Sequence, residues 1–245
     1  MAKRKSGGVV ETIKTVVYAM LIAIVIRTVA FEPFNIPSGS MIPTLLVGDY
    51  LFVAKYSYGY SRFSLPLSPP LFSGRIFGQL PERGDVAVFK LPRDTSVDYI
   101  KRIIGLPGDT VQMIHGQLYI NGKEVERIPD GDYLAEGDGP QMLLKRYIEV
   151  LPNGRRHEIL KASDDQPLDN TQLYKVPPGY VFAMGDNRDN SLDSRVLTAV
   201  GFIPLENLVG RAEFLFFSVD ATAPWWEVWE WPFEIRWSRL FTAIH

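Results

Sequence analysis

The chain has 245 residues, a net charge of −2 and no cysteine. This length is enough for one or two packed domains, and the balanced charge leaves no basic excess for binding nucleic acid. The lack of cysteine excludes disulfides and thiolate zinc sites. The histidines, His115, His157 and His245, form no H-E-x-x-H pattern, so we expect no metal site.

The first predicted element is a membrane segment. Basic residues at positions 3–5 precede a largely apolar stretch over residues 8–31, whose centre at 15–26 carries no charge. With its flanking turns, this stretch approaches the ~20 residues that cross a bilayer. Because basic residues favour the cytosolic side, we expect residues 1–7 in the cytosol and the rest of the chain outside. A cleaved signal peptide ending at residues 28–30 and a buried core helix are the alternatives.

After residue 31, short apolar runs separated by turn residues replace helical periodicity. Such runs predict strands, and the clearest are residues 50–54, 86–91, 97–104 and 180–184. Residues 118–125 predict a hairpin that turns at Asn121-Gly122, a pair that favours a type I′ turn. We therefore expect a mainly β, antiparallel fold.

Composition divides the rest of the chain. Residues 32–111 and 179–219 read as one β core, with residues 112–178 as a more polar β subdomain inserted into it. Residues 57–81 are rich in Ser, Tyr, Pro and Gly and predict a long exposed loop with at most a short hairpin.

The C-terminal residues 220–245 are unusually aromatic. All five tryptophans fall between Trp225 and Trp237, and Arg236 and Arg239 interleave with the apolar side chains. Tryptophan favours the headgroup region of a membrane, so this tail is predicted to lie in the membrane interface. The alternative is an aromatic cap on the domain core.

Two residues far apart in sequence suggest a nucleophile and its base. Ser40 lies in a bend bracketed by Pro37 and Pro43, which suits a projecting hydroxyl. A serine needs a base, and a lysine serves only if burial lowers its pKa to about 8, which takes roughly 3 kcal/mol of desolvation. Lys101 fits this requirement, because the strand period places it between Tyr99 and Ile103 on one face. Taken singly, a capping serine and a snorkelling lysine explain both residues equally well.

A dense polar run follows the apolar strand at residues 180–184. It extends from Gly185 to Arg195 and holds many hydrogen-bonding side chains. Such a concentration next to a core strand suits groups that orient a catalytic base, although a solvated loop is the simpler alternative.

Together these segments closely resemble the bacterial type I signal peptidases. The resemblance covers most of the chain and rests on the membrane segment and four motifs, which are residues 37–49, 83–89, 99–109 and 185–195. It departs from the two-span members of that family, because this chain has only one convincing membrane segment. The insert at 112–178, the loop at 57–81 and the tail lie outside the shared motifs.

The resemblance implies a site and a fold. Ser40 would be the acylating nucleophile and Lys101 the general base, with the Ser40 N–H and the Ser38 hydroxyl as the oxyanion hole. Ser191 would hold the Lys101 amine, and Asp193 with Arg195 would brace that loop. Residues expected to line two small hydrophobic subsites are Phe34, Ile36, Pro37, Leu45, Val88, Tyr99, Ile100 and Gly185. The implied fold is a signal-peptidase-like antiparallel β catalytic core with an inserted second β subdomain, after one transmembrane helix.

The resemblance also implies the reaction and its surroundings. A membrane-bound serine endopeptidase would remove signal peptides from exported preproteins after small, Ala-x-Ala-like sites, without a cofactor. We expect it in the bacterial inner membrane, in contact with lipid and near the secretion translocon, with the catalytic domain on the outer side.

Three other functions are alternatives to this prediction. A self-cleaving repressor-type protease shares Ser/Lys chemistry but predicts an N-terminal DNA-binding domain, where this chain has an apolar segment. A penicillin-binding type enzyme requires lysine three residues after the serine, and that residue is Pro43. An anchored β scaffold requires Ser40 and Lys101 to be dispensable.

Overall fold

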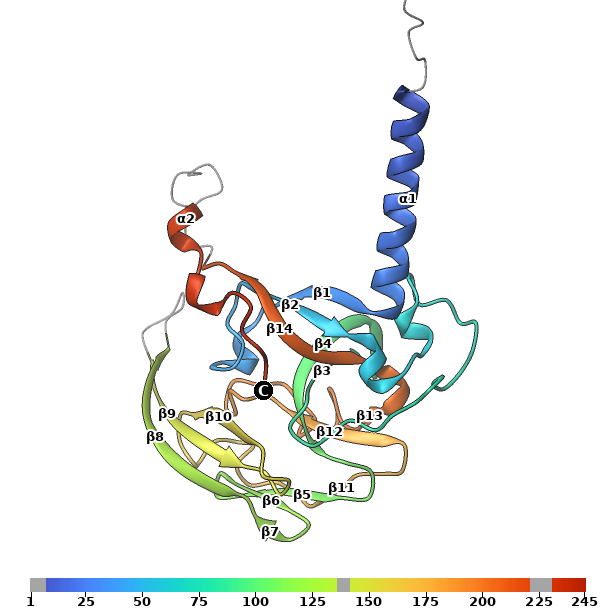
Figure 1. Cartoon of the computed structure of the whole chain (residues 1–245). Coiled ribbons are helices and arrows are strands. Elements are labelled where there is room, and N and C mark those ends of the chain that lie inside the picture. Colours follow the sequence, from blue (N-terminus) through green and yellow to red (C-terminus); the bar gives the residue numbers. More distant parts are fainter. Residues whose placement is uncertain (1–7, 136–141, 221–230) are drawn as a thin grey trace, which may run out of the picture.

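The computed structural model describes residues 8–135, 142–220 and 231–245, with one long N-terminal helix above a mainly antiparallel β body (Figure 1). Helix α1 spans Gly8–Val29. Its segment Val10–Val29 has a mean hydropathy of 1.8 and is not buried, so it is long and apolar enough to cross a membrane. The interpretation as a buried core helix is therefore wrong.

The largest sheet has seven strands in the order β1-β2-β14-β3-β4-β12-β13, and neighbouring strands are antiparallel. Its strands are β1 (Phe31–Asn35), β2 (Asp49–Ala54), β3 (Val86–Leu91), β4 (Asp94–Gly105), β12 (Tyr180–Met184), β13 (Ile203–Pro204) and β14 (Leu208–Ser218). The bounds of β3 and β12 agree with the sequence prediction. Strand β4 begins earlier than predicted, because Asp94 still pairs with Leu91 across a two-residue turn.

Two smaller sheets are formed by the residues between β4 and β12. One has the order β11-β5-β6-β7 and the other β10-β9-β8. Their strands are β5 (Thr110–Ile114), β6 (Gln117–Ile120), β7 (Lys123–Glu124), β8 (Glu126–Ala135), β9 (Met142–Val150), β10 (Arg156–Lys161) and β11 (Tyr174–Lys175). Asn121 and Gly122 have φ angles of 54° and 72°, so the predicted type I′ hairpin is confirmed.

The inserted strands are fastened to the segment that follows β12. The Leu160 N–H of β10 donates to Asp186 O over 2.9 Å, and the Arg188 N–H donates to Leu160 O over 3.0 Å. The Arg188 guanidinium also forms a buried ion pair with Glu149 of β9. The three-stranded sheet β10-β9-β8 thus holds the polar run at residues 185–195 in place.

The C-terminal tail runs back along β14. The Phe241 N–H donates to Leu215 O over 2.8 Å, and the Leu215 N–H donates to Thr242 O over 2.9 Å. Trp237 and Phe241 are exposed, so these two rings do not cap the core. Trp225, Trp226 and Trp229 lie outside the described residues, and the interface role of the tail stays a prediction.

Candidate active site

Ser40 lies in a short 3-10 helix, η1 (Gly39–Met41), within the loop that joins β1 to β2. The base of this loop is closed by two backbone bonds, from Ile36 N to Asp49 O and from Gly48 N to Ile36 O. Met41 and Leu45 pack into the core beneath it. The loop is therefore anchored on both sides of the serine, which fixes the position of the hydroxyl.

Lys101 approaches Ser40 from strand β4 of the same sheet, which β14 and β3 separate from β2. Its Nζ lies 2.6 Å from Ser40 Oγ and 3.0 Å from Ile100 O, and it sits 5.4 Å from the centre of the Tyr99 ring. Burial lowers the pKa of Lys101 to about 8, although the negative charges of Asp193 and Asp186 act in the opposite direction. The structure thus places Lys101 in a buried setting of the kind that a lysine base requires.

The loop after β12 braces this pair from behind. Asp193 and Arg195 form a bidentate ion pair, with both N–O distances 2.9 Å, and Asp193 also accepts a bond from the Gly185 N–H. Burial acts to raise the pKa of Asp193, but the Arg195 guanidinium holds it below its usual range. Because Asp193 stays ionised at neutral pH, its ion pair with Arg195 continues to hold the loop after β12 in this conformation.

One expected contact is absent. Ser191 Oγ is buried and contributes to lowering the pKa of Asp193, but it makes no hydrogen bond to the Lys101 amine in the described part of the chain. The reason is that Lys101 Nζ turns toward Ser40 Oγ and takes the Ile100 carbonyl as its second partner. A Cβ at Gly185 would lie 2.2 Å from Ser191 Oγ and 2.5 Å from Ser40 O. Gly185 therefore permits the close packing of the serine loop on this segment.

The predicted oxyanion and substrate residues fall into two groups. Ser38 Oγ lies 3.5 Å from Ser40 Oγ, beside a groove of about 550 Å³ that also includes Pro37, Tyr99 and Ile100. Apolar side chains that belong to the core cluster beneath the serine loop are Phe34, Ile36, Leu45 and Val88. Ile100 both lines the groove and packs against this cluster, so the cluster lies directly beside the groove.

Comparison with known proteins gives this arrangement a family. The sequence profile described as "Signal peptidase, peptidase S26" matches residues 9–217. The chain belongs to the signal peptidase S26 family. Signal-peptide cleavage by a serine protease is the activity of this family, and the predictions of family and enzyme class are confirmed.

Relatives that carry the name signal peptidase I are similar over most of their length. The protein of Rickettsia typhi (strain ATCC VR-144 / Wilmington) is 44% identical, over 93% of this chain and 91% of its own. That of Rickettsia massiliae (strain Mtu5) is 47% identical, over 86% and 80%. A crystal structure of a signal peptidase I from Enterococcus faecalis V583 is 28% identical over 54% of this chain and 97% of its own, but its TM-score of 0.32 is too low for a comparison of folds.

Several residues of this signal peptidase site were not singled out from the sequence. Asn187 donates from its backbone N–H to Ser40 O and from Nδ2 to Gly39 O, both over 3.1 Å. Asn190 and Leu192 line the groove. All three lie in the polar run at 185–195, so their position in that motif is the sequence feature that could have identified them. The partners of Asn187 are more than 140 residues away in sequence, so only the fold reveals them.

A buried ion pair ties the serine loop to the same run. The Arg102 guanidinium donates to both carboxylate oxygens of Asp186, over 2.9 and 2.8 Å. Thr44 Oγ1 donates to Asp186 Oδ2 over 2.6 Å. Burial acts to raise the pKa of Asp186, but Arg102 keeps it lowered. Lys101 and Arg102 are adjacent on β4, so one strand supplies both the amine and the brace.

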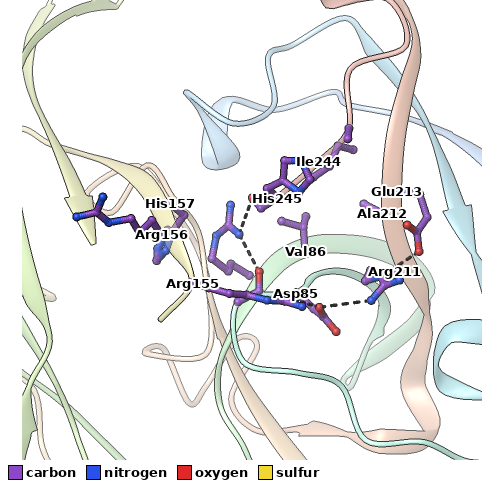
Figure 2. A pocket seen from close by; sticks show the side chains of 13 residues that line it. Asp85, Val86, Arg155, Arg156, His157, Arg211, Ala212, Glu213, Ile244 and His245 are labelled. Atoms are coloured by element: carbon purple, nitrogen blue, oxygen red, sulfur yellow. Dashed lines mark hydrogen bonds and ion pairs between the residues drawn. The ribbon is translucent and has the colours of Figure 1, made fainter. Parts of the chain in front are cut away.

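A second cavity lies behind this brace, between Gly84–Val86, β14 and residues 243–245 (Figure 2). Four of its charged side chains form ion pairs within the cavity, Arg155 with Asp85 at 2.6 Å and Arg211 with Glu213 at 2.9 Å. His157 is buried at its edge, and burial lowers the pKa of this histidine. Within the described residues, no group of three His, Asp or Glu side chains is arranged to hold a metal ion.

Proposed function

We propose that this protein cleaves N-terminal signal peptides from exported preproteins through an acyl-enzyme on Ser40, with Lys101 as the general base. The observation that supports this most strongly is the 2.6 Å contact between Lys101 Nζ and Ser40 Oγ in a buried site. Because burial lowers the lysine pKa to about 8, about a tenth of the amine is neutral at pH 7. That fraction is able to accept a proton.

The reaction begins when Ser40 Oγ attacks the scissile carbonyl carbon and its proton passes to the neutral Lys101 amine. The Ser40 N–H and the Ser38 hydroxyl donate to the oxyanion that forms. One such donor commonly contributes ~10²–10³ in rate. The Lys101 ammonium then protonates the leaving amine, and the carbon–nitrogen bond breaks. Water, deprotonated by Lys101, attacks the acyl-enzyme and restores Ser40, so the cycle uses no cofactor.

The substrate binds as an extended strand beside β4. Strand β12 pairs with β4 only from Arg102 to Gly105, so residues 97–101 meet no partner from β12. An extended peptide can bond to this free edge without a consensus sequence. The apolar cluster that includes Phe34, Ile36 and Val88 adjoins the groove through Ile100, and this supports small apolar, Ala-sized residues at the first and third positions before the cleaved bond.

The site works at the outer face of the bacterial inner membrane. Helix α1 is a single anchor whose basic N-terminus stays in the cytosol, and the β body stands where precursors leave the translocon. The alternative of a cleaved signal is open to a direct measurement. Intact mass of the membrane-extracted protein is expected to include residues 1–30, and their loss would contradict the anchor.

A cleavage assay tests the dyad. Ser40→Ala and Lys101→Arg are expected to lose cleavage of a precursor with an Ala-x-Ala site, since arginine stays charged and cannot accept the proton. Lys123→Ala, which changes an exposed lysine of β7, is the control and should cleave normally. Retained activity in either dyad variant would show that the protein acts by another mechanism or as an anchored scaffold.

A further inference from the structure

The loop at 57–81 has a tip that the active site does not explain. Leu67 is fully exposed and Leu71 is 73% exposed. Leu67 and Ser68 have φ angles of 63° and 50°, a backbone region that residues other than glycine rarely adopt. The chain thus holds a leucine outward, in an unfavourable conformation, at a point where it contacts no core.

The base of this loop is fixed, so the tip has a defined position. The buried Lys55 ammonium donates to Ser64 O over 2.8 Å and pairs with Glu32 at 2.8 Å. On the returning side, Arg75 donates to Tyr58 O and Gly59 O, over 2.8 and 2.6 Å. A loop with these contacts at its base presents its apolar tip as part of the folded structure.

The tip lies at the level where α1 ends. Tyr60 Oη donates to Val29 O, in the last turn of the helix, over 2.7 Å. Leu67 and Ser68 share a cleft with Arg27, the basic residue of that last turn. Figure 1 shows the segment that follows η3 (Arg62–Ser64) beside the lower end of α1. Because an arginine at the end of a span reaches the headgroups, Leu67 is placed at the same depth.

We propose that residues 65–71 are a second membrane contact, in which Leu67 inserts at the boundary between headgroups and acyl chains. This rests on the proposed role of α1 as an anchor. The lipid surface is the occupant because the exposed leucine belongs to a loop that Tyr60 bonds to Val29 at the end of α1, and α1 is itself exposed, apolar and long enough to span a bilayer. Asp98 lines both the cleft beneath the tip and the substrate groove. Docking at this loop therefore sets the orientation of the groove relative to the bilayer.

The absence of cysteine makes a direct depth measurement possible. Full-length Leu67→Cys, Leu173→Cys and Ile22→Cys variants are labelled with an environment-sensitive fluorophore and reconstituted in vesicles of phosphatidylethanolamine and phosphatidylglycerol. Leu173 is an exposed leucine beside β11, far from α1, and Ile22 lies within the span. We expect the emission of the fluorophore at position 67 to be shifted to the blue and to be quenched by lipids spin-labelled near the headgroup. We expect neither effect for the fluorophore at position 173. Identical spectra at positions 67 and 173 overturn the proposal, and so does a water-exposed probe at position 22, which removes the anchor itself.

Activity separates this proposal from the catalytic one. Leu67→Ser is expected to raise KM several-fold for a precursor embedded in the same vesicles and to leave kcat/KM for a soluble peptide in detergent unchanged. Leu173→Ser is the matched control and should change neither value. An equal loss in vesicles and in detergent would mean that Leu67 acts through the fold, and it would refute the membrane contact. A wild-type protein inactive on both substrates would instead refute the proposed function.

Discussion

Three lysines among the described residues are almost fully buried, Lys55, Lys101 and Lys161, and Lys101 is the one without a carboxylate partner. Lys101 is 4% exposed and contacts the Ser40 hydroxyl and the Ile100 carbonyl. Lys161 is 1% exposed and lies between the carboxylates of Asp169 and Asp189, at 2.5 and 3.1 Å. Carboxylates within this range compensate the charge of a buried ammonium, whereas neutral oxygens do so only weakly. Burial alone therefore does not make a base, and the missing carboxylate distinguishes Lys101.

The first prediction removes the compensated lysine. Lys161→Met leaves Asp169 and Asp189 buried without their cation, so we expect a loss of about 3–5 kcal/mol in the free energy of unfolding. Urea denaturation of the full chain in detergent measures this. Lys145→Met is the matched control, because its ion pair with Asp132 is exposed and screened by solvent, so its loss should change the stability little. Equal effects of the two substitutions would contradict the comparison.

The second prediction removes the uncompensated lysine. Burial lowers the pKa of Lys101 from 10.5 to about 8, and at ~1.36 kcal/mol per pH unit this corresponds to about 3 kcal/mol. Lys101→Met should therefore abolish cleavage and raise the free energy of unfolding at pH 7 by up to about 3 kcal/mol. Thermal or urea unfolding provides the measurement. A destabilisation like that of Lys161→Met would show that Lys101 is a structural residue.

The third prediction concerns how the protonation of Lys101 makes stability and activity depend on pH. Below about pH 8 the amine is protonated in both the folded and unfolded states, so the folded protein bears the full cost of the buried charge. Between about pH 8 and 10.5 only the unfolded state keeps the proton, and the stability of the wild type rises toward that of Lys101→Met. In the same protein, kcat/KM for a peptide should fall about tenfold per pH unit below about 8. A kcat/KM that is flat from pH 6 to 8 would exclude Lys101 as the base.

Helix α1 and the loop at 57–81 differ in how far the local sequence predicts them. An apolar run such as residues 10–29 carries its own signal, because length and hydropathy are properties of the local sequence. The loop at 57–81 was recognised from its composition as exposed. That Leu67 stands beside the end of α1 depends on the Tyr60 bond to Val29 and on the anchoring of Lys55 and Arg75, which no local pattern encodes.

The same limit applies to the active site. The local sequence at 185–195 predicts a bracing segment, and the family resemblance implies that Ser191 holds the Lys101 amine. In the fold that amine bonds to Ser40 and Ile100, and Asn187 fastens the serine loop. The local sequence limits which residues are polar and near a strand, but rotamers and the packing of distant segments decide which atoms meet.

By itself, the sequence determined the clearest strands, the Asn121-Gly122 hairpin and the apolar N-terminal helix, which follow from periodicity and turn chemistry that act over a few residues. Local patterns left Ser40 and Lys101 ambiguous, and the family resemblance made them a specific prediction. Only the tertiary structure decided that Lys101 has no carboxylate beside it while Lys161 has two. A buried lysine becomes a base or a structural cation through the charges that the fold brings within a few ångströms of its amine, because those charges set the free energy of its protonated form.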